Sequence, residues 1–246
     1  MGAQPSSREW QALFAGPDVA LVMALRDAAE AGDANAMVQL GQCLLDGRGA
    51  ARDAPVAFGW FHRAARAGLI DAVNMVGRCL DQGWGVPEMP EQAAAWFAVA
   101  AARGHAWGQY NLATALALGR GVTMDRVRAL DLFHAVATGA TEPLVGAKAA
   151  GMIGLFHEEG WTVLRCRDTA MAYHARAARG GDFRGCFNWA RLLAESGHIT
   201  GARYWLGRAR ALAERDGNAR FVAQMDGWLR DRPGLSGFDL SDNDSQ

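Results

Sequence analysis

Histidine and cysteine are the residue types in this sequence that could do chemistry, and their spacing first raises the question of a metal site. The chain has six histidines and four cysteines. His62, His134 and His174 each follow an aromatic residue, in what we predict to be the same position of a repeat. Ligands in successive repeats would stand too far apart to share one ion, because zinc binds nitrogen at about 2.1 Å. We therefore predict half-exposed polar positions and no metal.

Two other short stretches contain groups that could react. The stretch His157–Glu159 contains a histidine and two carboxylates, which could bind a metal ion. We interpret its histidine instead as hydrogen-bonded in the core. Cys166 lies between Arg165 and Arg167, and neighbouring positive charge lowers the pKa of a thiol. Its loop is predicted to be longer than the others, and no histidine stands beside it in sequence. A reactive thiol is thus an alternative rather than the main prediction.

Glycine-rich segments could in principle bind phosphate. Gly47–Gly49 and Gly119–Gly121 each have the pattern Gly-Arg-Gly, but neither follows a predicted strand nor ends in Gly-Lys-Ser/Thr. The Gly-x-Ser-x-Gly pattern of a nucleophilic serine is also missing from the sequence. We therefore interpret these glycines as turn residues and predict that the chain is not an enzyme, with no catalytic residues and no cofactor.

The same glycines reveal the repeat that organises most of the chain. Gly41 returns as Gly77, and Gly47 returns as Gly83 and Gly119, at a spacing of 36 residues. Each unit has the pattern helix, glycine loop, helix. Gly41 falls in the middle of a predicted helix, where glycine costs about 1 kcal/mol relative to alanine. We therefore predict that two helices approach each other closely at this position.

The spacing of apolar residues predicts five helix pairs within residues 31–211. Asp53 is a suitable N-cap for the second helix of the first pair, and Pro55 suits its first turn. Asp125 and Asp168 are predicted to cap later second helices, and residues 139–143 are an irregular insertion. The predicted second helices span residues 54–67, 93–102, 129–137, 170–178 and 202–211.

We predict that additional helices cover the apolar surfaces at both ends of the five helix pairs. Residues 1–30 are interpreted as a lead-in with capping helices, Trp10–Phe14 and Val19–Ala31, with Asp18 able to cap the second. Residues 212–232 are predicted to contain a C-terminal capping helix. Residues 233–246 are acidic, carry no cation and are predicted to be disordered.

The composition restricts the partners and the compartment. The 246 residues carry a net charge of −1, so no basic field exists to attract nucleic acid or an anionic membrane. Neither a membrane-spanning apolar run nor a signal peptide is found in the sequence. Cys43 and Cys79 hold the same repeat position and are predicted to be buried free thiols, too far apart for a disulfide. We expect a reducing compartment, the cytoplasm.

These residues together resemble the Sel1-like repeat family, which is related to tetratricopeptide repeats and is mostly bacterial. The first unit carries the resemblance in Leu40–Gly41, Gly47–Gly49, Asp53, Trp60–Phe61 and Ala64–Ala65. Ala113 stands where the family has glycine, and Met89 where it has aspartate. The resemblance implies an all-α superhelical solenoid that binds protein partners. It also points to an adaptor in a bacterial regulatory or iron-uptake system.

The concave side of such a solenoid is lined by the first helices, and their outward residues are the candidates for binding a peptide or protein. Aromatic residues and arginine anchor interfaces, while asparagine and arginine can hold a peptide backbone or a carboxylate. Core packing of Trp107 remains an alternative to partner binding. The candidate partner-binding residues are Asp71, Asn74, Arg78, Trp107, Tyr110, Arg184 and Arg191.

Two functions follow from these observations. The first is a non-enzymatic adaptor that binds a partner peptide or protein in the concave groove. The alternative is a metal- or redox-responsive regulator that uses the histidines and cysteines.

Overall fold

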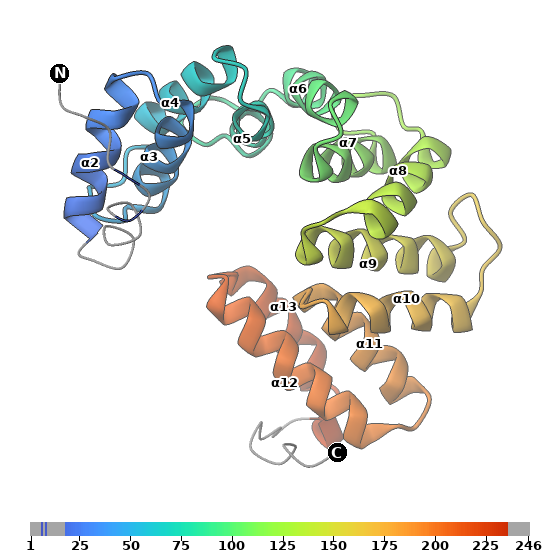
Figure 1. Ribbon diagram of the computed structural model, residues 1–246. Coiled ribbons are helices and arrows are strands. Elements are labelled where there is room, and N and C mark those ends of the chain that lie inside the picture. Colours follow the sequence, from blue (N-terminus) through green and yellow to red (C-terminus); the bar gives the residue numbers. More distant parts are fainter. Residues whose placement is uncertain (1–5, 7, 9–17, 236–246) are drawn as a thin grey trace. The chain divides into compact units, whose positions relative to one another are not determined.

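The chain is all-α, as the sequence predicts. The computed structural model describes Ser6, Arg8 and residues 18–235. These residues form twelve α-helices and one short 3-10 turn, and they contain no strand (Figure 1). The ten helices from α3 to α12 follow the five predicted pairs in order along the chain, with α2 before them and α13 after them. The predicted helix Trp10–Phe14 lies outside the described residues.

The helices divide into two compact units, one ending at Asp125 and the other beginning at Arg126. The first unit contains α2 (Asp18–Glu30), α3 (Ala34–Asp46), α4 (Ala54–Arg66), α5 (Ile70–Gln82), α6 (Pro90–Ala102) and α7 (Ala106–Leu118). The second contains α8 (Arg126–Gly139), α9 (Pro143–Glu159), α10 (Arg167–Arg179), α11 (Phe183–Glu195), α12 (Ile199–Arg215), α13 (Ala219–Arg230) and the 3-10 turn η1 (Pro233–Leu235).

The helix boundaries follow from local residue chemistry. Asp53 caps α4 as predicted, because its Oδ1 accepts a hydrogen bond from the Val56 backbone N–H at 3.0 Å. Pro55 lies in the first turn of α4, where its missing N–H is not needed. Gly47 ends α3 with a left-handed φ of 72°, a conformation that glycine adopts without strain.

A glycine in the first helix of a pair lets an aromatic ring from the second helix pack against the backbone. A Cβ atom at Gly41 would lie 2.7 Å from Cε1 of Phe61, and one at Gly77 would lie 2.6 Å from Cε1 of Phe97. Both distances are too short for van der Waals contact, so only glycine fits. The predicted close approach at Gly41 is therefore confirmed.

A second glycine contact sets the distance between successive pairs. A Cβ atom at Gly85 would overlap the backbone of Ala54 and Pro55 at the start of α4, in the preceding pair. Gly49 and Gly121 meet the preceding backbone in the same way. Thr162 holds the equivalent loop position in the second unit and has a positive φ of 61°, although it is not a glycine.

The structure corrects several details of the later repeats. The loop before α10 is not longer than the others, since residues 47–53, 83–89 and 160–166 each connect two helices of a pair with seven residues. Cys166, and not Asp168, is the N-cap residue of α10. The insertion at 139–143 is absorbed because α8 continues to Gly139 and α9 begins at Pro143.

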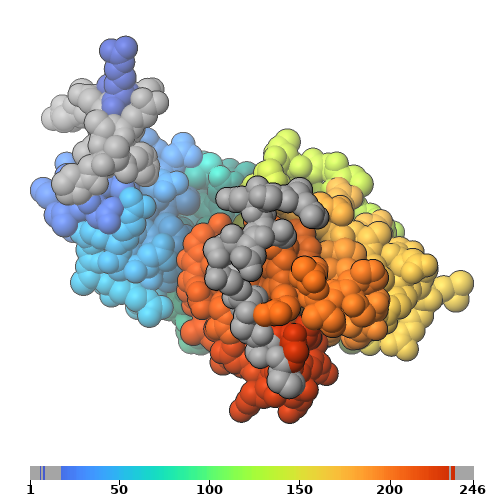
Figure 2. Space-filling model, turned by 90° about the horizontal axis from the view of Figure 1, so that it is seen from below, coloured from blue at the N-terminus to red at the C-terminus, as the bar shows by residue number. Residues whose placement is uncertain are grey.

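The C-terminal part of the second unit is packed beyond the predicted capping helix. Helix α12 continues to Arg215, and the 3-10 turn follows α13. Leu235 in this turn is buried in one cluster with Leu206 and Met225, so order continues past Pro233, where the sequence predicts that it ends. Figure 2 shows this region in orange to red. Residues 236–246 lie outside the described residues.

Within the part of the chain that the structure describes, no helix is long and apolar enough to cross a bilayer.

Replacing Gly85 by alanine should destabilise the first unit more than the same change at Gly104. Both glycines have left-handed backbones, with φ of 76° and 79°, and alanine costs about 1–2 kcal/mol in that conformation. Only at Gly85 would the methyl group also overlap neighbouring backbone, which adds about 1–3 kcal/mol. Urea unfolding followed by circular dichroism measures both costs. Equal midpoints for the two variants would contradict the close approach at Gly85.

Candidate functional site

The first candidate site is a strip of polar and aromatic side chains in the first unit. Asp71, Asn74 and Arg78 lie along one side of α5 at helical spacing. Helix α7 contributes side chains at the same spacing. We call this strip the α5–α7 face, and its residues are Asp71, Asn74, Arg78, Trp107, Tyr110 and Asn111.

Two side-chain contacts join α5 to α7 across this face. Asn111 Nδ2 donates to Asn74 Oδ1 at 2.9 Å. His105, the N-cap of α7, accepts a hydrogen bond at Nδ1 from the Gly108 backbone N–H at 3.0 Å. Because Nδ1 accepts, the proton lies on Nε2, which donates to Asp71 Oδ1 at 3.0 Å. Each contact therefore pairs a candidate residue, Asp71 or Asn74, with a residue that the sequence analysis did not select. Asn74 is buried, with 5% of its surface exposed, and not outward-facing as predicted.

Arg78 is a half-buried arginine with unusual neighbours. Its Nη1 donates to the Met75 sulfur at 3.5 Å, and its guanidinium lies over the Trp84 ring, 4.9 Å from the centroid. Burial lowers the pKa of Arg78, since the charged form loses contact with water. Among the residues that the structure describes, no carboxylate forms an ion pair with this guanidinium.

Trp107 and Tyr110 form an aromatic pair next to the asparagines. Their rings meet edge to face, with centroids 6.0 Å apart and an interplanar angle of 80°. Both side chains are half-buried, so each packs against the helix and keeps part of its ring at the surface. Trp107 is therefore neither fully buried in the core nor fully exposed.

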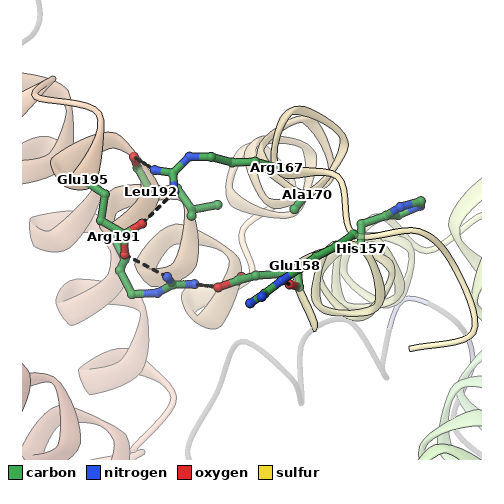
Figure 3. Close-up of a pocket in the computed structure, with 8 residues that line it drawn as sticks. His157, Glu158, Arg167, Ala170, Arg191, Leu192 and Glu195 are labelled. Carbon is green, nitrogen blue, oxygen red and sulfur yellow. Dashed lines mark hydrogen bonds and ion pairs between the residues drawn. The ribbon is translucent and has the colours of Figure 1, made fainter. Parts of the chain in front are cut away.

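The second candidate site is a pocket of about 410 Å³ in the second unit (Figure 3). We call it the α9–α11 pocket. It lies between α9, α10 and α11 and holds Arg191, one of the predicted binding residues. Its lining residues are His157, Glu158, Arg165, Arg167, Ala170, Arg191, Leu192 and Glu195.

A chain of alternating charges crosses this pocket. Arg167 Nη1 donates to Glu195 Oε2 at 3.0 Å, and Arg191 Nη1 donates to Glu195 Oε1 at 3.0 Å. Arg191 Nη2 also donates to Glu158 Oε1. The dashed lines in Figure 3 follow this order. Arg191 therefore has two carboxylate partners within its own unit, whereas the other predicted arginine of this unit, Arg184, is exposed beside the Phe183 ring.

His174 lies next to Glu158 at the end of this row of charged residues. The sequence prediction that it is half-exposed is wrong. It is fully buried rather than half-exposed, and its Nε2 lies 3.2 Å from Glu158 Oε2. A Cβ atom at Gly154 would lie 2.7 Å from the His174 ring, so His174 occupies the core position that Phe61 holds in the first pair. The signal was available in the sequence, because the glycine and the ring are 20 residues apart in both pairs.

His157 differs from its prediction as well. Its ring stacks on Tyr173, with centroids 6.0 Å apart and an angle of 6°. Its buried Nδ1 has no hydrogen-bond partner, so the predicted core hydrogen bond is not formed at this atom. The stacking contact holds the ring instead, and Figure 3 shows it pointing away from the charge chain.

Glu158 is the titrating group most affected by this arrangement. The hydrogen bond from His174, followed by that from Arg191, lowers the pKa of Glu158 from 4.5 to about 2, against burial, which raises it. The carboxylate therefore stays ionised over the physiological range and joins three helices.

The histidines and cysteines are dispersed in the described residues. Searched over Ser6, Arg8 and residues 18–235, no group of three His, Cys, Asp or Glu side chains is arranged to hold a metal ion. Cys43 and Cys79 are buried free thiols, as predicted. Burial raises the pKa of Cys79 to about 11. Cys166 is exposed, and a hydrogen bond from Thr169 Oγ1 at 3.1 Å lowers its pKa.

Comparison with known families places the chain among repeat proteins. Residues 34–69, 70–105, 108–137 and 147–182 match the family described as Sel1 repeat, and together they make up more than half of the chain. The matched segments correspond to the glycine-marked pairs described above.

Solved structures support the same fold. A Sel1 repeat protein from Oxalobacter formigenes is similar with 24% identity and a TM-score of 0.72, over 94% of this chain and 93% of that one. A protective antigen from uropathogenic Escherichia coli has 24% identity and a TM-score of 0.60, over 87% of this chain and 45% of that one. An immunity protein from Pseudomonas aeruginosa has 16% identity and a TM-score of 0.53, over 97% and 86%. None of the curated proteins matches the sequence.

Glu158→Gln should lower stability in a pH-dependent way. A carboxylate whose pKa is lower in the folded state stabilises the fold above its unfolded pKa, and this contribution is lost as the pH falls toward the folded pKa. The difference between wild type and Glu158→Gln should thus be constant above pH 4.5 and shrink between pH 4.5 and about 2. Urea midpoints across this range measure it. Glu159→Gln, at the exposed neighbouring residue, is the control, and an equal effect there would contradict the role of Glu158.

Thiol reactivity should separate Cys166 from the other cysteines. Cys166 is exposed with a lowered pKa, whereas Cys43, Cys79 and Cys186 are buried with raised pKa values. A chromogenic disulfide reagent should therefore titrate one fast thiol in the folded chain and the other three only after unfolding. Cys166→Ser should abolish the fast phase, and a fast phase that survives this substitution would refute the assignment.

Proposed function

We propose a non-enzymatic protein-binding role for this chain, which belongs to the Sel1 repeat family. Proteins of this family are generally scaffolds for protein–protein interaction. For this chain we place the binding surface on the α5–α7 face, where a peptide or protein partner would bind to the first helices of the repeat. A bacterial cytoplasmic adaptor, serving a regulatory or iron-uptake system, is the setting that the family resemblance favours.

The observation that carries this proposal is the environment of Arg78. The Arg78 guanidinium has exchanged much of its contact with water for contacts with a thioether and an aromatic ring. This loss of hydration costs free energy unless a bound partner supplies new hydrogen bonds to the charge. Binding of a partner that brings hydrogen-bond acceptors would provide that compensation. The aromatic pair Trp107 and Tyr110 lies on the neighbouring helix and provides the type of anchor that dominates binding energy at interfaces.

We propose different roles for the two candidate arginines of the second unit, Arg184 and Arg191. Arg191 is bonded to Glu158 and Glu195, so releasing it for a partner would break two existing ion pairs. We propose that its main role is to hold α9 and α11 together. Arg184 is exposed, and we propose it as a separate partner contact on the second unit.

A redox-responsive regulator is the second candidate function. It is favoured by one observation, the exposed Cys166 thiol with a lowered pKa at the N-terminus of α10. The other three thiols are buried, so a response would depend on this residue alone. The thiol titration described above tests the property that this candidate requires.

Partner capture with matched variants tests the proposed surface. Immobilised wild type should retain a specific set of proteins from a bacterial extract, and Arg78→Ala and Trp107→Ala should each reduce their recovery about tenfold or more, as expected for interface anchors. Arg208→Ala is the matched control, because it also removes a surface arginine next to a tryptophan ring, in the second unit. Quantitative mass spectrometry measures recovery, and circular dichroism verifies folding. Equal recovery by Arg78→Ala, Trp107→Ala and wild type would exclude the α5–α7 face.

A further inference from the structure

Resting on the proposed function, we infer that the α5–α7 face binds an extended acidic segment of its protein partner. An aspartate or glutamate of that segment binds Arg78, and an apolar side chain packs on the pair formed by Trp107 and Tyr110.

Arg78 provides the attraction for the carboxylate. Its two contacts, the Met75 sulfur and the Trp84 ring, do not neutralise a full positive charge. Asp46 acts on Arg78 electrostatically, but Asp46 Oδ2 already accepts a hydrogen bond from Gln42 Nε2 at 2.8 Å. A carboxylate from a partner would form a charge-assisted, potentially bidentate pair with the guanidinium. This pair is strengthened by the low-dielectric surroundings of a half-buried group.

The charges on α5 also fix where the carboxylate binds. Asp71 lies seven residues before Arg78, about 10 Å away along the helix axis. The Asp71 side chain is 63% exposed and repels a second carboxylate at its end of the face. The acidic residue of the partner therefore binds at the Arg78 end, and the Asp71 end selects against it.

The amide pair between these ends suits an extended backbone. Asn74 is buried, with 5% of its surface exposed, whereas Asn111 is half-buried. The bond from Asn111 Nδ2 to Asn74 Oδ1 does not use Asn111 Oδ1, an acceptor. An extended peptide offers backbone N–H groups that can donate to this oxygen, whereas a helical segment would keep them within its own backbone.

The geometry predicts the spacing of the bound residues. Asn74 and Arg78 are one helical turn apart, about 6 Å along the axis, and an extended chain covers about 3.3 Å per residue. Tyr110 is adjacent to Asn111, which is bonded to Asn74. The apolar residue should therefore be two or three positions from the acidic residue.

Selection from a random peptide library tests this inference. Twelve-residue peptides displayed on phage are selected on the immobilised full chain. Enriched peptides should share an Asp or Glu two or three positions from an aromatic or aliphatic residue. A synthetic peptide from this set should bind Arg78→Ala at least tenfold more weakly than wild type, the effect of losing a charged hydrogen bond. Its own Asp→Asn or Glu→Gln variant should lose as much, and Arg208→Ala should bind it normally.

Other outcomes separate the inference from the proposed function. Enriched peptides that lack a carboxylate, and that bind Arg78→Ala normally but not Trp107→Ala, would overturn the acidic segment and leave the binding face in place. Peptides that bind both variants as tightly as wild type would overturn both proposals. A selection with no enrichment over a bare surface would also count against both, because the face is then not a peptide site.

Discussion

The close approach of backbones at glycine is the constraint on which the rest of the structure depends. Gly41 and Gly77 admit a phenylalanine ring against the helix within a pair, and Gly85 admits the carbonyl of the preceding pair. Each contact removes the space that a single methyl group would occupy. Because packed interiors leave few voids, these contacts fix both the distance inside a pair and the distance between pairs. For α5, they set its distance from α4 and α6.

The second unit keeps the packing of a ring against a helix glycine, but the ring is a histidine instead of a phenylalanine. His174 replaces the phenylalanine and packs on Gly154 in the same way, but it brings two ring nitrogens into the core. Its Nε2 lies beside Glu158, which in turn holds Arg191, whereas its buried Nδ1 has no hydrogen-bond partner. One substitution in a core position thus organises a polar network across three helices. In the first unit, Phe61 and Phe97 hold these positions, and Arg78 lies half-buried beside the Trp84 ring.

The sequence predicts the fold well because its signals are local and repeated. The pairs, the capping by Asp53 and the packing role of Gly41 all depend on residues within one unit. The assignment of residues to repeat positions is wrong after the insertion at 139–143, which shifts all later positions. The sequence therefore predicts Asp168 as a cap and His174 as a surface residue, and neither prediction is correct. The site was harder to predict. Sequence reasoning selected Arg78 as a candidate, but its loss of water depends on Met75 and Trp84 meeting it in space. The contact of Arg191 with Glu158 was not predicted because the two residues are 33 positions apart, whereas its contact with Glu195, four residues on, is local.

The longer helix α9 shows how such a chain can change its length. It has 17 residues, against 13 in α3, α5 and α7, and the additional turn lies at its N-terminal end. The 20-residue interval from Gly154 to His174 equals that from Gly41 to Phe61, so the insertion leaves the packing inside the pair unchanged. The boundary between the third and fourth pairs therefore absorbs the insertion, while the fifth pair changes inside, since only residues 196–198 connect α11 and α12. In an array whose units contact mainly their neighbours, such local changes of length need not disturb the packing of distant pairs.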